Sequence, residues 1–176
     1  IPNAGSNQTI CSGASATLGG SALGFPTTVI SQDFNTGTWP ATWTRTNNGG
    51  RSPGDFRTTF EAASAGNTWA AAGHTGYCSY FYSFLIGSGV SGDMISPAMD
   101  LTTYSASNLT FWIYNSTGTD NVKVYANNNG GAYTQLGSTY SNYGSWTQIT
   151  INLNSYVGTG FNNVRIKFTG TSDGVG

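Results

Sequence analysis

Apolar residues recur at every second position in several short stretches of this chain, and this alternation constrains the fold more than any other feature of the sequence. A period of two places successive side chains on opposite faces of a β-strand, so each stretch has one apolar face and one polar face. Clusters of Gly, Asn, Ser or Pro, which favour turns, separate the stretches. The clearest alternating sets are Leu109/Phe111/Ile113, Val122/Val124, Ile149/Ile151/Leu153 and Val164/Ile166/Phe168.

The number and shortness of these stretches predict an all-β protein, an antiparallel β-sandwich of the jelly-roll type with about nine or ten strands and an extended N-terminal segment. Residues 127–131, Asn-Asn-Asn-Gly-Gly, are expected to form a β-hairpin loop. No stretch has the period of a helix. Further strands are expected at residues 28–33, 43–46, 69–72, 80–86, 93–96 and 133–136.

Charge is scarce in this sequence, with 6 Lys and Arg against 7 Asp and Glu. The charged fraction of 7% lies far below the roughly 25% of ordinary soluble proteins, and no basic cluster is present. We therefore expect no nucleic-acid partner, and no apolar stretch approaches the roughly 18 residues that membrane insertion requires. The opening residues lack a signal-peptide pattern, and the lysine-poor, Thr/Asn/Gly/Tyr-rich composition favours a secreted protein whose leader has been removed.

The first 24 residues differ from the rest of the chain. They contain two brief apolar stretches and end in a Gly/Ser-rich linker, so a domain boundary is expected near residue 25, with one domain over residues 25–176. The two cysteines, Cys11 and Cys78, fall on either side of this boundary. They could form one disulfide that closes a long loop, or remain two separate thiols.

From Val29 onward the sequence resembles the MAM-like jelly-roll modules of the cleaved-adhesin, or choice-of-anchor J, type. The motifs that carry the resemblance are residues 29–34 with 39–43, 93–101, 109–114 with 121–125, and 145–153 with 163–168. Residues 1–24 resemble instead the opening of a bacterial immunoglobulin-like or PKD-like repeat. The resemblance implies a module of secreted and surface proteins of Bacteroidetes-type bacteria that functions in adhesion.

Members of this family continue into a closing strand, so the resemblance implies that the domain over residues 25–176 lacks its last strand. A jelly roll without one strand leaves an unpaired sheet edge. Residues 7–18 of another copy could fill that gap by strand addition and build a fibre. A chain cut from a longer protein is the alternative explanation.

The resemblance also implies calcium, bound where the first strand meets the last. Asp33 is then the first candidate ligand, with Asp93 and Asp173 as further candidates. Carboxylate oxygens suit this hard cation. For each of the three, a turn or loop cap that accepts hydrogen bonds from nearby backbone amides is the alternative reading.

Aromatic residues alternate with the core positions on two of the expected strands. If Leu109, Phe111 and Ile113 face the core, Trp112 and Tyr114 point outward, and Tyr125 points away from Val122 and Val124 in the same way. We expect these three aromatic side chains to form one outer platform on which sugar rings or a protein partner could stack. Coverage of this face by a neighbouring loop, by residues 1–24 or by the next domain is the alternative.

Patterns that resemble catalytic motifs lack the context that those motifs need. Residues 87–92 fit G-x-G-x-x-G but precede an expected strand instead of a helix, and residues 170–174 fit G-x-S-x-G without a helix to follow. His74 is the only histidine and Glu61 the only glutamate. Together with the resemblance, this predicts a non-catalytic adhesion or assembly module that binds a protein, a glycan or copies of itself, with a carbohydrate-binding module of a secreted hydrolase as the alternative.

Overall fold

A computed structural model describes residues 28–50, 54–58, 76–83, 86–115 and 118–174. The chain divides into two units, Ile1–Ser31 and Gln32–Gly176, shortly after the boundary near residue 25 that the sequence predicts. Only residues 28–31 of the first unit are described. All the described strands lie in the second unit.

Regular structure in the described residues is almost entirely β. The strands are β1 (Thr44–Arg45), β2 (Phe56–Thr58), β3 (Ser79–Phe81), β4 (Ser91–Ile95), β5 (Asn108–Ile113), β6 (Asn121–Asn128), β7 (Thr134–Tyr140), β8 (Thr147–Asn152) and β9 (Val164–Thr171). One turn of 3-10 helix, η1 (Asn154–Tyr156), follows β8.

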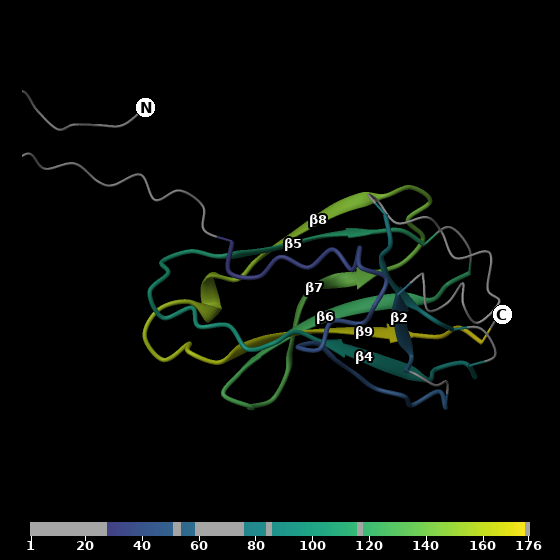
Figure 1. The fold of residues 1–176 in the computed structure, drawn as a ribbon, viewed down its shortest axis with the longest axis horizontal. Helices are drawn as coiled ribbons and strands as arrows, with labels where there is room; N and C mark the ends of the chain where they lie inside the picture. Colours follow the sequence, from purple (N-terminus) through teal and green to yellow (C-terminus); the bar gives the residue numbers. More distant parts are fainter. Residues whose placement is uncertain (1–27, 51–53, 59–75, 84–85, 116–117, 175–176) are drawn as a thin grey trace, which may run out of the picture. The chain divides into compact units, whose positions relative to one another are not determined.

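Five strands form an antiparallel sheet in the order β1-β4-β9-β6-β7, which runs along the length of the domain (Figure 1). Strand β9 lies inside this sheet, so Phe168 is opposite Met94 of β4 on one side and opposite Val124 of β6 on the other. All three side chains are buried. The inner face of the sheet is consequently apolar at its centre.

A second layer is formed by β5 and β8, which pair antiparallel with Phe111 opposite Ile149. The ring of Phe111 lies 5.2 Å from that of Phe168 at an interplanar angle of 85°, the edge-to-face arrangement that aromatic pairs prefer. Ile113 and Ile151 belong to the same core cluster as Phe168. The apolar faces of the two sheets therefore meet, which confirms the all-β sandwich that the alternation predicts.

Strands β2 and β3 form a two-stranded sheet in which Phe56 is opposite Phe81. The ring of Phe81 lies against the backbone of β9 at Gly170, where an added Cβ would be 2.4 Å from a ring carbon. Only glycine leaves room for this approach. The β2–β3 sheet is thus fixed to the C-terminal half of β9.

The expected hairpin loop joins β6 to β7. Asn129 and Gly130 have positive φ values of 53° and 71°, and the Gly131 amide donates a hydrogen bond to the Asn128 carbonyl at 3.0 Å. Strand β6 extends through Asn128 and β7 begins at Thr134, so the loop spans residues 129–133, two positions later than the sequence pattern indicates.

Some strand predictions were wrong. Residues 28–33 form no strand, and the strand expected over residues 80–86 is limited, in its described part, to Ser79–Phe81. The strand expected over residues 69–72 lies outside the described residues.

The sequence analysis missed β2 because its central residue is a buried arginine. The Arg57 guanidinium lies 4.2 Å from the centre of the Tyr82 ring, and its Nε donates a hydrogen bond to the Gly54 carbonyl at 3.1 Å. These contacts compensate for the loss of hydration, which sequence periodicity cannot reveal.

The contact between Gly170 and Phe81 gives a first prediction. We expect Gly170→Ala to lower the free energy of unfolding by about 1–3 kcal/mol, because the added methyl group must displace a packed ring or the backbone. Urea denaturation measures this change. Gly144→Ala is the matched control, since an added Cβ there meets nothing within 4 Å. Equal effects of the two substitutions would contradict the packing.

Candidate binding surfaces

The structure separates the aromatic residues that the sequence analysis placed on one platform. Trp112 and Tyr114 come from β5 and its end, whereas Tyr125 comes from β6. Strand β5 pairs with β8 in one sheet, and β6 belongs to the five-stranded sheet. The prediction of a single platform was therefore wrong: the two sheets meet by their inner faces, so their outer faces point in opposite directions.

The first surface is a strip of aromatic side chains on the outer face of the β5–β8 sheet. Trp112 alternates with buried Ile113 and is 44% exposed. Two positions further on, the ring of Tyr114 lies 5.6 Å from that of Trp146 at an angle of 33°. Trp146 lies across from Tyr114, since Ile113 pairs with Thr147. We call Trp112, Tyr114 and Trp146 the aromatic strip.

Trp146 was not among the residues that the sequence analysis selected. The outward position of Trp146 could have been predicted from the sequence. Ile149 and Ile151 face the core, and Trp146 lies an odd number of residues away from both, so its side chain is on the other face of the strand. What the sequence does not show is that β8 pairs with β5, which brings Trp146 beside Tyr114.

The remainder of this outer face is polar. Thr110 is opposite Thr150, and Asn108 is opposite Asn152. All four side chains are exposed, as is Gln148 opposite Trp112. The strip is therefore bordered by hydroxyl and amide groups that can donate and accept hydrogen bonds.

The second surface is on the outer face of the five-stranded sheet and is centred on Lys167. Its ammonium lies 4.9 Å from the centre of the Tyr125 ring and 4.5 Å from that of the Tyr133 ring. The same ammonium forms an ion pair with Asp93 at 3.5 Å. Burial raises the pKa of Tyr133, while the charge of Arg165 acts in the opposite direction. The phenol is therefore neutral at physiological pH.

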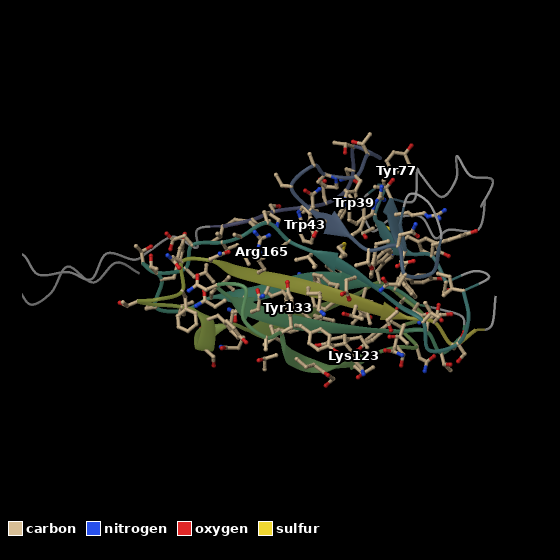
Figure 2. The ribbon with its side chains drawn as sticks, turned by 90° about the horizontal axis from the view of Figure 1, so that it is seen from below. Trp39, Trp43, Tyr77, Lys123, Tyr133 and Arg165 are labelled. Atoms are coloured by element: carbon tan, nitrogen blue, oxygen red, sulfur yellow. The ribbon has the colours of Figure 1, made fainter. Side chains whose placement is uncertain are left out.

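Two further cations share this face. Lys123 is opposite Thr169, and Arg165 is opposite Asn127, in the same pairing that sets Tyr125 opposite Lys167. Residues directly opposite each other project from the same face of a sheet. Figure 2 shows Lys123, Tyr133 and Arg165 along this sheet. We call the set Asp93, Lys123, Tyr125, Tyr133, Arg165 and Lys167 the cationic face.

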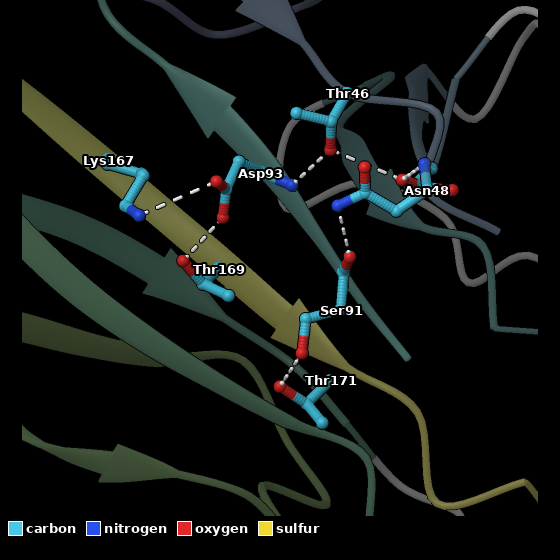
Figure 3. Close-up of polar contacts among 8 residues, drawn as sticks. Thr46, Asn48, Ser91, Asp93, Lys167, Thr169 and Thr171 are labelled. Carbon is cyan, nitrogen blue, oxygen red and sulfur yellow. Dashed lines mark hydrogen bonds and ion pairs between the residues drawn. The ribbon is translucent and has the colours of Figure 1, made fainter. Parts of the chain in front are cut away.

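A network of hydroxyl groups continues from Asp93 across the sheet (Figure 3). Thr169 donates a hydrogen bond to the Asp93 carboxylate at 2.6 Å, and the Asp93 amide donates to Thr46 Oγ1 at 2.7 Å. Ser91 and Thr171 share a hydrogen bond of 2.8 Å further along the same strands. The Thr169 bond holds the carboxylate of Asp93 from β9, and the Thr46 bond fixes the backbone amide of Asp93 from the residue that follows β1.

The three candidate calcium ligands lie in separate surroundings. Asp33 caps a turn by accepting a hydrogen bond from the Asn35 amide at 3.0 Å, which holds the pKa of Asp33 below its usual value. Asp93 is paired with Lys167, and Asp173 accepts a hydrogen bond from the Thr119 hydroxyl at 3.0 Å. Over the described ranges, no three His, Cys, Asp or Glu side chains form a group that could hold a metal ion. The three carboxylates therefore do not fit one shared calcium site.

Asp55 is a buried carboxylate that the sequence analysis did not select. It is 0% exposed and accepts hydrogen bonds from the backbone amides of Asn48 at 2.7 Å and Gly49 at 2.9 Å. Thr46 donates a third hydrogen bond at 3.2 Å. Asp55 thus ties the turn after β1 to the start of β2, which is a structural role.

The patterns that resemble catalytic motifs do not form catalytic sites. Residues 87–92 lead directly into β4, with no helix N-terminus for a phosphate. In residues 170–174, Ser172 is buried and its hydroxyl donates to the Ile86 carbonyl at 3.2 Å, so it is not an exposed nucleophile. His74 and Glu61 lie outside the described residues. So does Cys11, so the pairing of Cys11 with Cys78 stays a prediction.

Known structures with a similar fold include two bacterial cleaved-adhesin domains. No protein-family model and no curated protein matches the chain. The K1 cleaved-adhesin domain of Lys-gingipain from Porphyromonas gingivalis matches with a TM-score of 0.58 and 22% sequence identity, over 84% of this chain and 96% of that one. The K3 cleaved-adhesin domain of the same protein matches with a TM-score of 0.57 and 17% sequence identity, over 82% of this chain and 94% of that domain. The chain has a fold similar to that of these two adhesin domains.

A carbohydrate-binding module, TmCBM61 solved in complex with β-1,4-galactotriose, has a related fold. Its TM-score is 0.53 at 12% identity, over 81% of this chain and 85% of that one. These likenesses confirm the adhesin-like fold that the sequence motifs indicate, whereas the MAM-like and PKD-like assignments stay predictions. In the described part of the chain, no helix has the length and apolar character needed to cross a membrane.

Two carboxylates meet where β9 ends and β6 begins. The Asp173 amide donates a hydrogen bond to Asp120 Oδ1 at 2.8 Å. Burial raises the pKa of Asp120, the charge of Asp173 acts in the same direction, and a hydrogen bond from Ser83 opposes both. The folded state therefore holds a proton on Asp120 more tightly than the unfolded chain does, and this group reduces stability as the pH rises above the usual aspartate range.

We expect Asp120→Asn to stabilise the protein at pH 7 by about 0.5 kcal/mol, a small effect because solvent screens this partly exposed group. The gain should disappear at pH values below the usual aspartate pKa, where wild-type Asp120 is also neutral. Denaturant unfolding at both pH values measures it. If Asp120→Asn were instead less stable than the wild type by the same amount at both pH values, the lost hydrogen bonds of Asp120 would matter more than the removed charge.

Proposed function

We propose that this chain is a non-catalytic extracellular adhesion module that binds a glycan on the aromatic strip. The observation that supports this most directly is Trp112, a large aromatic side chain that is 44% exposed on a regular strand beside the Tyr114–Trp146 pair. Exposed aromatic surface of this kind is costly in water and is typical of binding sites.

The chemistry of the strip suits a sugar. The face of an indole or phenol ring packs against the apolar C–H face of a sugar ring, and the bordering hydroxyl and amide groups can bind its hydroxyls. Thr110, Thr150 and Gln148 are positioned for this on the same face. The strip needs no metal or catalytic group for such binding.

The fold comparisons favour binding over catalysis. Two of the similar structures are adhesin domains, and a third is a carbohydrate-binding module solved with a galactose oligosaccharide. A carbohydrate-binding module of a secreted hydrolase is the second reading and uses the same surface. Adhesion is favoured because both adhesin domains have higher TM-scores and sequence identities.

Export to the cell surface of a Bacteroidetes-type bacterium is part of this proposal.

Trp112→Ala should weaken glycan binding about tenfold, because a stacked aromatic ring contributes on the order of 1 kcal/mol beyond the area that it buries. A glycan array followed by titration calorimetry with the best ligand measures the loss. Tyr77→Ala is the matched control, since Tyr77 is 43% exposed but lies outside the strip. Unchanged binding by Trp112→Ala, or an equal loss in both variants, would contradict the proposed site.

Assembly by strand addition is a second proposal. In the described sheet, β7 lies at one end of the strand order, and its side chains are mostly exposed and uncharged. An edge of this kind can accept an added strand. Residues 7–18 of another copy are the proposed donor.

If strand addition occurs, the purified chain should form polymers, and Thr9→Pro with Ala16→Pro should leave it monomeric, because proline cannot donate the backbone hydrogen bonds of an added strand. Light scattering coupled to size exclusion distinguishes the two states. A wild-type chain that stays monomeric at high concentration would exclude this mode of assembly, while the glycan proposal would stand.

A further inference from the structure

We infer that the cationic face is a second binding surface, opposite the aromatic strip, and that its ligand is a polysaccharide bearing carboxylate groups. This inference is independent of the proposed site on the β5–β8 sheet, because it concerns different residues on the other outer face of the sandwich. Three observations support it: the distribution of charge, the spacing of the cations, and the contacts that hold the Asp93 carboxylate.

The distribution of charge is uneven. The chain has 6 Lys and Arg residues and a net charge of −1. Three of these cations, including both lysines of the sequence, share the cationic face with one carboxylate, that of Asp93. The face therefore carries a local net charge of +2 on a chain that is otherwise acidic, and such a patch attracts anions.

The cations lie close enough to bind one extended ligand. Lys167 and Arg165 are two positions apart on β9, and Lys123 is diagonal to Lys167 across the β6–β9 pair. Both arrangements separate Cβ atoms by roughly 7 Å. The rings of Tyr125 and Tyr133 both lie next to the Lys167 ammonium, so aromatic surface accompanies the charge.

Two of the three cations have donors to spare. Among the described residues, Lys123 forms no ion pair, and Arg165 donates one hydrogen bond, from Nη1 to the Ser96 carbonyl at 3.2 Å. A guanidinium has five N–H donors, and an ammonium has three. Lys167 is more enclosed, with 18% of its side chain exposed, and serves to hold the two tyrosine rings in place.

The face already shows how it binds a carboxylate. Asp93 is held by the Lys167 ammonium at 3.5 Å and by the Thr169 hydroxyl at 2.6 Å. On β6, Lys123 is opposite Thr169 of β9 and also opposite Thr139 of β7, whose hydroxyl is exposed. A cation beside hydroxyl groups, the combination that holds Asp93, is therefore repeated at Lys123. A uronic acid offers a carboxylate and several hydroxyls on one ring, which matches this combination. Single cations spaced along a strand suit one charge per sugar better than the dense charge of a sulfated chain or a nucleic acid.

The test compares four polymers with the purified 176-residue chain. Affinity electrophoresis and titration calorimetry are carried out with polygalacturonate, neutral β-1,4-galactan, dextran sulfate and single-stranded DNA. We expect polygalacturonate to bind most tightly of the three polyanions and to weaken at high salt, because exposed charges are screened. Lys123→Gln and Arg165→Gln should each weaken polygalacturonate binding about fivefold, and Asp93→Asn should strengthen it.

A control variant separates this surface from the effect of net charge. Lys123→Gln and Thr103→Glu lower the net charge of the chain by the same amount, but Thr103 is exposed in the loop before β5 and belongs to neither surface. The inference requires that Thr103→Glu bind polygalacturonate as the wild type does. Thermal unfolding of each variant confirms that it is folded.

The other outcomes overturn the inference. Tighter binding of dextran sulfate or DNA, equal losses in Lys123→Gln and Thr103→Glu, or no binding of polygalacturonate would each exclude a polyuronate site on this face. Galactan binding that Trp112→Ala abolishes and Lys123→Gln leaves unchanged would support the proposed function alone. Failure of the two proposals can therefore be told apart.

Discussion

The hydrogen bonding of β9 on both of its edges is the constraint on which this domain depends. β9 comes after the other eight described strands in the sequence, yet it pairs with β4 on one side and with β6 on the other. Its inward residues, among them Ile166 and Phe168, fill the core, and its outward residues include Arg165 and Lys167. One strand therefore sets both the packing of the sandwich and the charge of its outer face.

The sandwich gives the molecule two different outer surfaces. The face of β5 and β8 is uncharged along its paired strands and carries the aromatic strip, whereas the opposite face combines tyrosines with three cations. The fold is similar to that of two cleaved-adhesin domains and of a carbohydrate-binding module. Ligand preference in such a fold depends on the side chains that each face presents.

Much of the fold could be predicted from the sequence because a period of two is a local property. The inward positions of Phe111, Ile151 and Phe168 follow from alternation alone, as does the outward position of Trp112. Which strands pair is a non-local property, and nothing in the residues of β5 indicates that β8 is its partner. For this reason the sequence analysis placed Tyr125 on the same platform as Trp112, although they lie on different sheets.

Buried polar groups were the other source of error. Asp55 and Arg57 are charged residues near the start of β2, and periodicity assigns such residues to the surface. Their partners are backbone amides, a carbonyl and an aromatic ring from other parts of the chain. The compensation for burying a charge lies in three-dimensional neighbours, which alternation does not encode.

The placement of both lysines on a single face has a practical consequence. Lys123 and Lys167 supply the two side-chain amines of this sequence that can be coupled to a solid support, and Lys123 makes fewer contacts than Lys167. A chain immobilised through these amines would be oriented, with the five-stranded sheet toward the support and Trp112 toward the solution. The sandwich thus determines which of its two surfaces such a sensor can report on.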